Sequence, residues 1–164
     1  MAKISQPPHP PALDALDVAI VTALAADARM SNRQLATMCG IAESTAHTRL
    51  RSLEAHGVIT GYRAVLSQEA LGNSIQALVG VSLRAGARQA HIEAFTEHVR
   101  ALREVTQYYF VGGGDDFVLH IAVADSAALR RFVVECVSGH DSVASTRTSI
   151  IFDYGHSGST GLVR

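Results

Sequence analysis

Residues 31–56, with the sequence SNRQLATMCGIAESTAHTRLRSLEAH, constrain the fold of this 164-residue chain more than any other stretch. Their pattern predicts two short helices separated by Gly40, a residue type that readily adopts the left-handed conformation found where helices end. Ser31 can cap the first helix, and Gln34 stands three residues later in a capping-box pattern. Two helices joined by such a turn are typical of a helix-turn-helix, which lays its second helix in a DNA groove.

The second helix of this pair is predicted to begin near Glu43 and to have two chemically different faces. At about 100° per residue, Ala46, Leu50 and Leu53 form a narrow apolar stripe that must pack against other helices. The opposite face is polar and carries positive charge, which suits a helix that reads a groove. Arg49 lies at about 60° from the stripe, so it is either partly buried or directed at a phosphate. A polar face opposite a core stripe is often only solvated, and for this helix alone that alternative stays open.

The flanking residues extend the pair into a small predicted domain, residues 13–60. An earlier helix is expected from Leu13 onward, capped by Asp14. After the pair, residues 57–66 are predicted to form two short strands, which make a wing, and Arg63 stands where a wing meets phosphate. Winged units most often bind DNA, although some bind proteins. The candidate DNA-binding residues are Ser44, Thr45, His47, Thr48, Arg49, Arg51 and Arg63.

From residue 74 onward the pattern predicts a separate module. Strands and helices are expected in the order strand, helix, strand, strand, helix, strand, over residues 74–83, 88–103, 105–111, 116–124, 129–136 and 143–154. This order is typical of a ferredoxin-like βαββαβ domain, here residues 74–154, after a linking strand and linker at 61–73. The predicted fold class is therefore α+β. Both helices should cover one sheet face, and pairing with a second copy would bury the other.

Composition limits the functional classes. Apolar residues make up 48% and charged residues 18%, a globular balance. No apolar run approaches the roughly 20 residues of a membrane span, and the N-terminus lacks a secretory apolar core, so a cytoplasmic location is expected. Residues 1–66 carry six basic and five acidic side chains, and residues 67–164 carry eight and ten. Because this charge is weak, DNA binding is expected to need more than one copy of the domain.

The remaining features indicate no catalytic or metal chemistry. All four prolines lie within residues 1–12, a predicted tail, and residues 155–164 are predicted to be a second one. Cys39 and Cys136 stand in apolar helical patterns and are expected to be small buried thiols. The eight histidines lack metal-ligand spacing, and no nucleophile, paired-carboxylate or phosphate-loop pattern stands in a suitable context. No metal, no cofactor and no enzymatic activity are therefore expected.

The loop Gly112-Gly113-Gly114-Asp115-Asp116 joins the two central predicted strands. A flexible hairpin turn would explain its glycines. A second interpretation is that successive backbone amides close on a carboxylate while a neighbouring aspartate pairs with an ammonium group. Those groups are the two ends of a free amino acid, so the loop is a candidate binding site.

Residues 13–72 resemble the Lrp/AsnC family, the feast/famine transcriptional regulators of bacteria and archaea. The matching pieces are L-D-x-x-D, R-x-S-x-x-x-L-A, R-L-x-x-L-E-x-x-G-V-I-x-G-Y and a later L-G, in that order. One position departs from the family: Ala42 stands where a serine usually opens the recognition helix, which removes a side-chain cap worth about 1 kcal/mol. The resemblance continues through the βαββαβ pattern to about Tyr154.

The resemblance implies a transcriptional regulator that binds operator DNA, with a C-terminal effector-binding domain, often called the RAM domain, that dimerises through its sheets. It implies a homodimer that assembles into tetramers or octamers and a small effector, expected to be an amino acid, bound between subunits. A G-x-x-D turn contributes to the family's effector pocket, and Gly113 to Asp116 match it. The effector-binding candidates are therefore Gly112, Gly113, Gly114, Asp115 and Asp116, with Asp116 favoured.

Two alternatives stay open at this point. The siroheme decarboxylases are enzymes with the same two domains, and Arg147 or His120 on the sheet would serve a tetrapyrrole site there. An orphan regulator, whose loop has lost its ligand, is the other.

Overall fold

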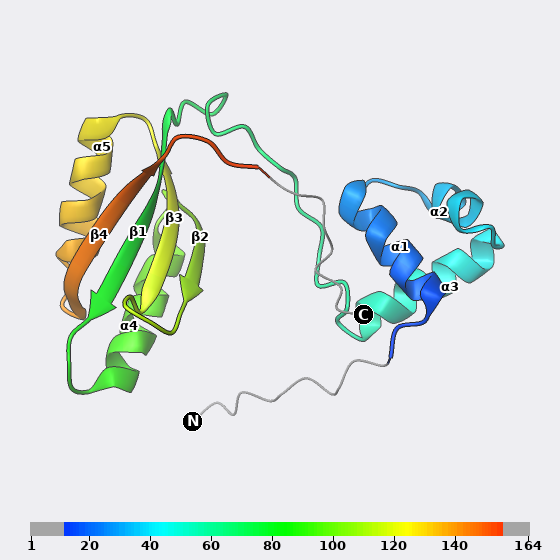
Figure 1. The fold of residues 1–164 in the computed structure, drawn as a ribbon, viewed down its shortest axis with the longest axis horizontal. Coiled ribbons are helices and arrows are strands. Elements are labelled where there is room, and N and C mark those ends of the chain that lie inside the picture. The colour runs from blue at the N-terminus through cyan, green and yellow to red at the C-terminus, as the bar shows by residue number, and fades with distance from the viewer. Residues whose placement is uncertain (1–11, 156–164) are drawn as a thin grey trace. The chain divides into compact units, whose positions relative to one another are not determined.

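A computed structural model describes residues 12–155 of the chain (Figure 1). The described residues divide into two compact units, one that ends at Val65 and one that spans Leu66–Tyr154. The first unit is helical and the second combines helices with a sheet, so the predicted α+β class is confirmed. Within the described part of the chain, no helix has the length and apolar character needed to cross a membrane. The predicted tails fall almost entirely outside the described residues.

Three helices build the first unit: α1 (Ala15–Ala26), α2 (Asn32–Cys39) and α3 (Glu43–Ala55). The side chain of Asp14 accepts a hydrogen bond from the Asp17 amide, and the Asp17 side chain accepts one from the Asp14 amide. Ser31 and Gln34 close the same reciprocal box at the start of α2. The predicted helix starts are therefore confirmed, because each capping side chain satisfies a backbone amide that the helix leaves unpaired.

The apolar stripe of α3 packs into the core of this unit, as predicted. Ala46 and Leu53 are buried, and Leu50 is half-buried against the same cluster. Ile20 of α1 and Leu35 of α2 are fully buried with them. Gly40 ends α2 in the left-handed conformation, with φ 66°, which confirms its predicted role.

The prediction of two wing strands after α3 is wrong: the described residues contain no strand between α3 and residue 75. Gly57, with φ 70°, instead ends the helix, since its amide donates to the Glu54 carbonyl and the Val58 amide to the Leu53 carbonyl. These two bonds form a Schellman motif, and Val58 packs on the helical core. The apolar residues that suggested a strand thus serve as the hydrophobic contact of a helix end.

The second unit is a four-stranded antiparallel sheet with helices. In chain order its elements are β1 (Ile75–Leu83), α4 (Arg88–Ala101), β2 (Val105–Phe110), β3 (Phe117–Val123), α5 (Ser126–Arg131), η1 (Phe132–Ser138) and β4 (Val143–Ile151). The strand order is β2-β3-β1-β4, with every neighbouring pair antiparallel, which confirms the predicted split topology. Two details differ from prediction: the last strand ends at Ile151, and the second helix continues as a π-helix, η1.

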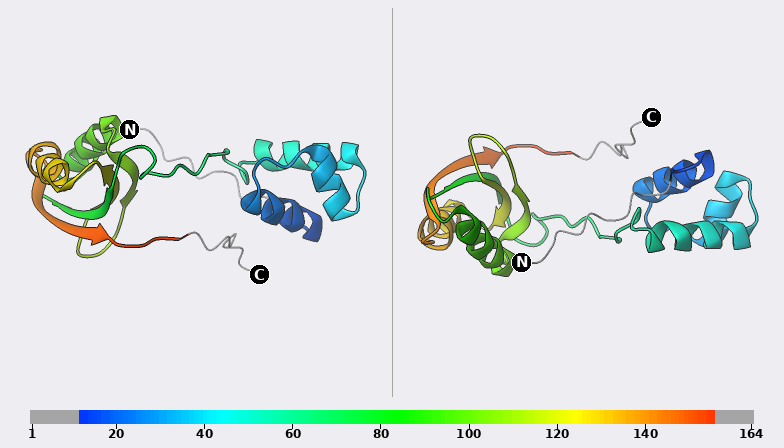
Figure 2. Two further views of the ribbon diagram at one scale, coloured as in Figure 1. Left: turned by 90° about the horizontal axis from the view of Figure 1, so that it is seen from above. Right: turned by 90° about the horizontal axis from the view of Figure 1, so that it is seen from below.

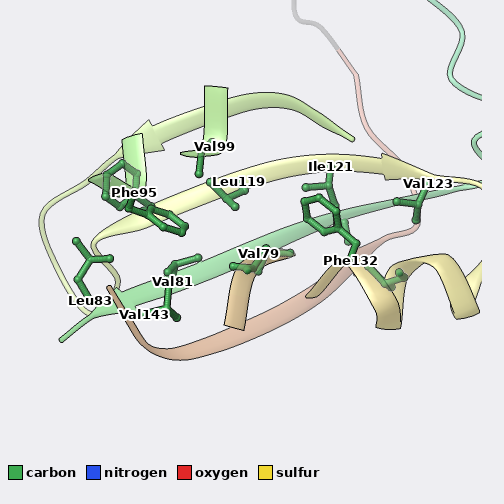
Figure 3. Packing of buried hydrophobic residues seen from close by; sticks show 14 residues of the cluster. Val79, Val81, Leu83, Phe95, Val99, Leu119, Ile121, Val123, Phe132 and Val143 are labelled. Carbon is green, nitrogen blue, oxygen red and sulfur yellow. The ribbon is translucent and has the colours of Figure 1, made fainter. Parts of the chain in front are cut away.

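One face of the sheet carries the core (Figure 3). Val79, Val81, Leu119 and Ile121 are fully buried there. Side chains from α4 and η1 cover them, and Phe95 meets Phe117 edge-on with ring centroids 5.0 Å apart. Both helices therefore cover the same face, as predicted, and Figure 2 shows α4 and α5 on one side of the sheet.

The opposite face of the sheet, called the open face, is covered by no helix of the second unit among the described residues. Register places Leu78, Gly80, Tyr109, Val118, His120, Arg147 and Ile151 on it. Leu78 is 40% exposed and Tyr109 is 47% exposed, so apolar surface remains on this face.

Candidate nucleic-acid interface and ligand site

The outward face of α3 presents the polar side chains that the sequence predicts. Ser44, Thr45, His47, Thr48 and Arg51 are all exposed on one helix. Arg51 makes no hydrogen bond or ion pair with any described residue, so its guanidinium keeps all its donors for a partner.

Arg63 follows α3 in an extended segment and is also exposed. The hydroxyl of neighbouring Tyr62 donates to Glu54 of α3 at 3.0 Å, which ties this segment to the last turn of the helix. Partial burial, together with the Glu54 carboxylate, raises the pKa of Tyr62. Arg63 is thus held close to the end of α3 without any wing strand.

Arg49 differs from the other candidates because it is engaged inside its own unit. Its Nη1 atom lies 2.7 Å from Asp14 Oδ2 and 3.2 Å from Asp17 Oδ1. The Asp17 amide, followed by Arg49, lowers the pKa of Asp14, and the Asp14 carboxylate raises that of Arg49. The geometry favours the structural alternative: Arg49 joins α3 to the capping box of α1.

Two further contacts define what α3 offers to a groove. The Thr48 hydroxyl donates to the Ser44 carbonyl at 2.9 Å, so that its methyl group and a lone pair remain for a partner. Nδ1 of His47 lies 3.0 Å from the side-chain nitrogen of Asn32, on α2. Sequence reasoning missed Asn32, since only the turn between the helices brings residues 15 positions apart together.

Ala42 occupies the N-cap position of α3 and provides no side-chain hydrogen bond. Its carbonyl accepts from the amides of Thr45 and Ala46, at 3.0 Å each, so the helix starts where predicted despite the missing cap. Glu43 supplies an acidic side chain in the first turn, which favours the positive end of the helix dipole.

The glycine loop leaves its backbone amides unused. The Val111 amide donates to the Asp116 carbonyl at 2.9 Å, which closes the hairpin at its base, and the Asp116 amide donates to the Val81 carbonyl of β1 at 2.8 Å. Within the described part of the chain, the four amides from Gly112 to Asp115 donate to no acceptor. Gly113 has φ 142°, a conformation that favours glycine. Consecutive free amides in such a turn can bind an anion.

Both carboxylate oxygens of Asp116, next to this loop, have a partner. Oδ2 accepts from the Leu83 amide at 2.7 Å, and Oδ1 is paired with Nη2 of Arg88. The Leu83 amide, and then Arg88, lower the pKa of Asp116, against the opposing effect of partial burial. Asp116 therefore anchors the loop to the end of β1 and the start of α4.

Asp115 points to the open face. Its Oδ2 atom is 2.6 Å from Nη2 of Arg147, the residue opposite Gly80 in the β1–β4 ladder. A Cβ atom on Gly80 would lie 2.5 Å from the same Oδ2 atom, so a glycine is needed for the carboxylate to lie there. The Asp115 side chain is 17% exposed and that of Arg147 is 72% exposed. The other carboxylate oxygen of Asp115, Oδ1, has no hydrogen-bond partner among the described residues.

His120 and the two cysteines are the remaining candidates for acid-base or metal chemistry. Nε2 of His120 lies 3.1 Å from the Gln76 side-chain oxygen, and burial lowers the pKa of His120. Cys39 and Cys136 are free and half-buried, and burial raises the pKa of the Cys136 thiol. Among residues 12–155, no group of three or more histidine, cysteine or acidic side chains is placed to hold a metal ion.

Two family models match the chain in these two units. A winged helix-turn-helix DNA-binding model matches residues 13–60, and a model of the Lrp/AsnC ligand binding domain matches residues 76–154. The HTH-type transcriptional regulator AldR of Mycolicibacterium smegmatis is 45% identical over 142 residues, which cover 87% of this chain and 82% of that protein. The proline dehydrogenase transcriptional activator of Rhizobium radiobacter is 34% identical over 139 residues, 85% of this chain and 88% of that protein.

A solved structure matches over nearly the same length. The crystal structure of a transcriptional regulator from Neisseria meningitidis in complex with L-methionine has a TM-score of 0.83 and 28% sequence identity. The match covers 92% of this chain and 96% of that one. The relatives are thus named as regulators of transcription, and the siroheme-decarboxylase alternative receives no support from them.

Proposed function

The chain belongs to the Lrp/AsnC family of DNA-binding transcriptional regulators, and we propose that it reads operator DNA with α3 and senses an amino acid at the Gly112–Asp116 loop. Its partners are accordingly DNA and a small-molecule effector.

The exposed, unpaired cations of the first unit support the DNA-binding residues. Sequence readout falls to the outward face of α3, and Arg51 and Arg63 bind phosphate. Arg49 leaves the candidate set because its guanidinium is already paired with Asp14 and Asp17. The proposed DNA-binding residues are Ser44, Thr45, His47, Thr48, Arg51 and Arg63.

The single observation that carries the effector site is that the loop holds two kinds of group without a partner among the described residues, backbone amides and a carboxylate oxygen. Free amides at Gly112 to Asp115 suit a carboxylate, and the free Oδ1 of Asp115 suits an ammonium group. Arg147 is mostly exposed and can supply further donors to the carboxylate. Both oxygens of Asp116 already have a partner, whereas Oδ1 of Asp115 has none, so we transfer the ammonium-binding role from Asp116 to Asp115 and give Asp116 the role of anchor. The relative crystallised with L-methionine supports an amino acid as the ligand class.

The open face supports assembly of the chain into a homodimer. Exposed Leu78 and Tyr109 would be buried when the same face of a second copy packs on it around a two-fold axis. Asp115 and Arg147 lie on this face, so a ligand there would contact both subunits. Further assembly into tetramers or octamers would multiply the weakly charged DNA-binding units, and operator DNA implies a cytoplasmic site of action.

We assign residues 13–60 to DNA binding, residues 61–73 to a linker and residues 74–154 to effector binding and assembly. An effector that binds one arrangement of the subunits more tightly than another shifts the population toward it. The DNA affinity then changes by the same coupling free energy.

A mobility-shift assay on the DNA upstream of the chain's own gene tests the DNA-binding part. The full-length protein should retard this duplex in the presence of excess unrelated DNA, and Arg51→Ala should need more protein to do so. Equal retardation of both proteins, or of specific and unrelated duplexes, would contradict the assignment.

A further inference from the structure

A hydrogen bond between α2 and α3 orients the imidazole ring of His47, which lies on the outward face of α3. Nδ2 of Asn32, the first residue of α2, lies 3.0 Å from Nδ1 of His47 in the N-terminal half of α3. His47 is exposed, whereas Asn32 is half-buried. Asn32 therefore supports a side chain that itself faces outward.

This hydrogen bond determines which imidazole nitrogen carries hydrogen. An amide nitrogen only donates, so Nδ1 of His47 is the acceptor and has no hydrogen. A neutral imidazole then carries its single hydrogen on Nε2, at the opposite side of the ring. With the Asn32 amide nitrogen as donor and the ring in this tautomer, His47 presents the N–H of Nε2 to whatever lies against α3.

We propose that Asn32 is a positioning residue for sequence recognition: it holds His47 as a neutral donor aimed at a guanine in the major groove. Guanine presents two neighbouring acceptors there, N7 and O6, so a single donor finds more acceptor sites on guanine than on any other base. The N-terminal half of a recognition helix is the part that contacts base edges. An uncharged donor adds little to phosphate binding, which depends on neutralising charge. The inference rests on the proposed role of α3 as the reading helix.

The charged neighbours do not replace Asn32 in this role. On α3, Glu43 precedes His47 by one turn and Arg51 follows it by one turn, so their opposite charges act on the ring together. On α2, Arg33 follows Asn32. Within the described residues, Glu43 forms no ion pair with His47.

Selection from a randomised DNA duplex pool, followed by sequencing, tests the proposal with the full-length protein. The wild type, Asn32→Ala and His47→Ala are compared, with Thr37→Ala as control. Thr37 lies on the same helix, and its hydroxyl bonds only the Arg33 carbonyl of that helix. We expect the preference for guanine at one position of the selected sequence to fall roughly fivefold to tenfold in both Asn32→Ala and His47→Ala. The preferences at the other positions, and all preferences of the control variant, should stay unchanged.

Two further measurements separate base reading from phosphate binding. Replacing that guanine by 7-deazaguanine in the selected duplex should weaken the wild type and leave Asn32→Ala unaffected. Asn32→Asp, whose carboxylate can only accept a hydrogen bond from the ring, should reduce the preference at pH 7.

Three outcomes would overturn the inference. His47→Ala with uniformly weaker binding and an unchanged sequence preference would make His47 a phosphate contact. Asn32→Ala with the full wild-type preference would remove Asn32 from recognition. Failure of the wild type to enrich any sequence would instead overturn the proposed function on which this inference depends.

Discussion

The carboxylate of Asp115 lies directly over the α-carbon of Gly80, so close that a Cβ atom at residue 80 would be 2.5 Å from Oδ2. A charged loop side chain thereby lies on the open face over the central strand β1, where it meets Arg147. Because this contact requires that residue 80 has no Cβ atom, a substitution that adds only a methyl group tests it.

Gly80→Ala should displace Asp115 from the sheet and break its pair with Arg147. Thermal shifts of the purified protein across the twenty common L-amino acids measure the effect, since a ligand that binds the folded state raises its melting temperature. We expect the shift seen with wild type to disappear in Gly80→Ala. Ser149→Ala, an exposed change on the same sheet face, should keep it. Identical shifts in Gly80→Ala and wild type would exclude Asp115 from the site.

Arg51→Ala and Arg49→Ala should separate DNA binding from structure. Removing one phosphate contact lowers affinity across all sequences and makes the slope of log K against log salt less negative by about 0.9. We expect this for Arg51→Ala with an unchanged melting temperature. Arg49→Ala should lower the melting temperature, because it leaves Asp14 and Asp17 unpaired, and should keep the salt slope. The reverse pattern would return Arg49 to the DNA interface.

Asp116 should make the second unit sensitive to acid. Its pKa is held below the ordinary value of 3.8, so the folded state binds the proton less readily than the unfolded chain does. The stabilisation is therefore complete above about pH 4 and is lost as the pH falls through the lower folded pKa. Asp116→Asn keeps an acceptor for the Leu83 amide without the charge. Urea unfolding at pH 5 and pH 3 should show a smaller loss of stability in this variant than in wild type, and equal losses would contradict the assignment.

Ala42→Ser should stabilise the first unit. A serine at this N-cap position can accept a hydrogen bond from the amide of Ser44 or Thr45, which typically contributes about 1 kcal/mol. Urea unfolding, followed by a probe of the helical unit, should show this increase. Ala42→Gly serves as the comparison, because it changes the residue without adding an acceptor. No gain with serine would mean that the cap cannot form in this turn.

The features that sequence predicts well are those set by neighbours along the chain. Asp14 and Ser31 cap helices through residues three positions away, and the alternation of Val79 and Val81 identifies both β1 and its buried face. The two wing strands were predicted wrongly because Gly57 and Val58 fit both a strand pattern and a helix-ending pattern. The helix-ending pattern is the one observed, because its hydrogen bonds form within a single turn.

The details of the candidate sites depend on contacts between distant residues. Nothing in the local sequence distinguishes Asp115 from Asp116, yet one faces Gly80 and the other accepts from Leu83. The pairing of Asn32 with His47 likewise arises only from the helix-helix turn. Residue types and periodicity predict the loop at residues 112–116 and the polar face of α3. They do not predict which side chains there lack a partner within the chain.

The most direct test of this account is the dissociation constant of the full-length protein on the upstream duplex of its own gene, titrated by fluorescence anisotropy with each common L-amino acid. The account predicts that at least one amino acid changes this constant in wild type and that Asp115→Asn abolishes the change while binding DNA normally. An unchanged constant across all of them, or an undiminished response in Asp115→Asn, would contradict it.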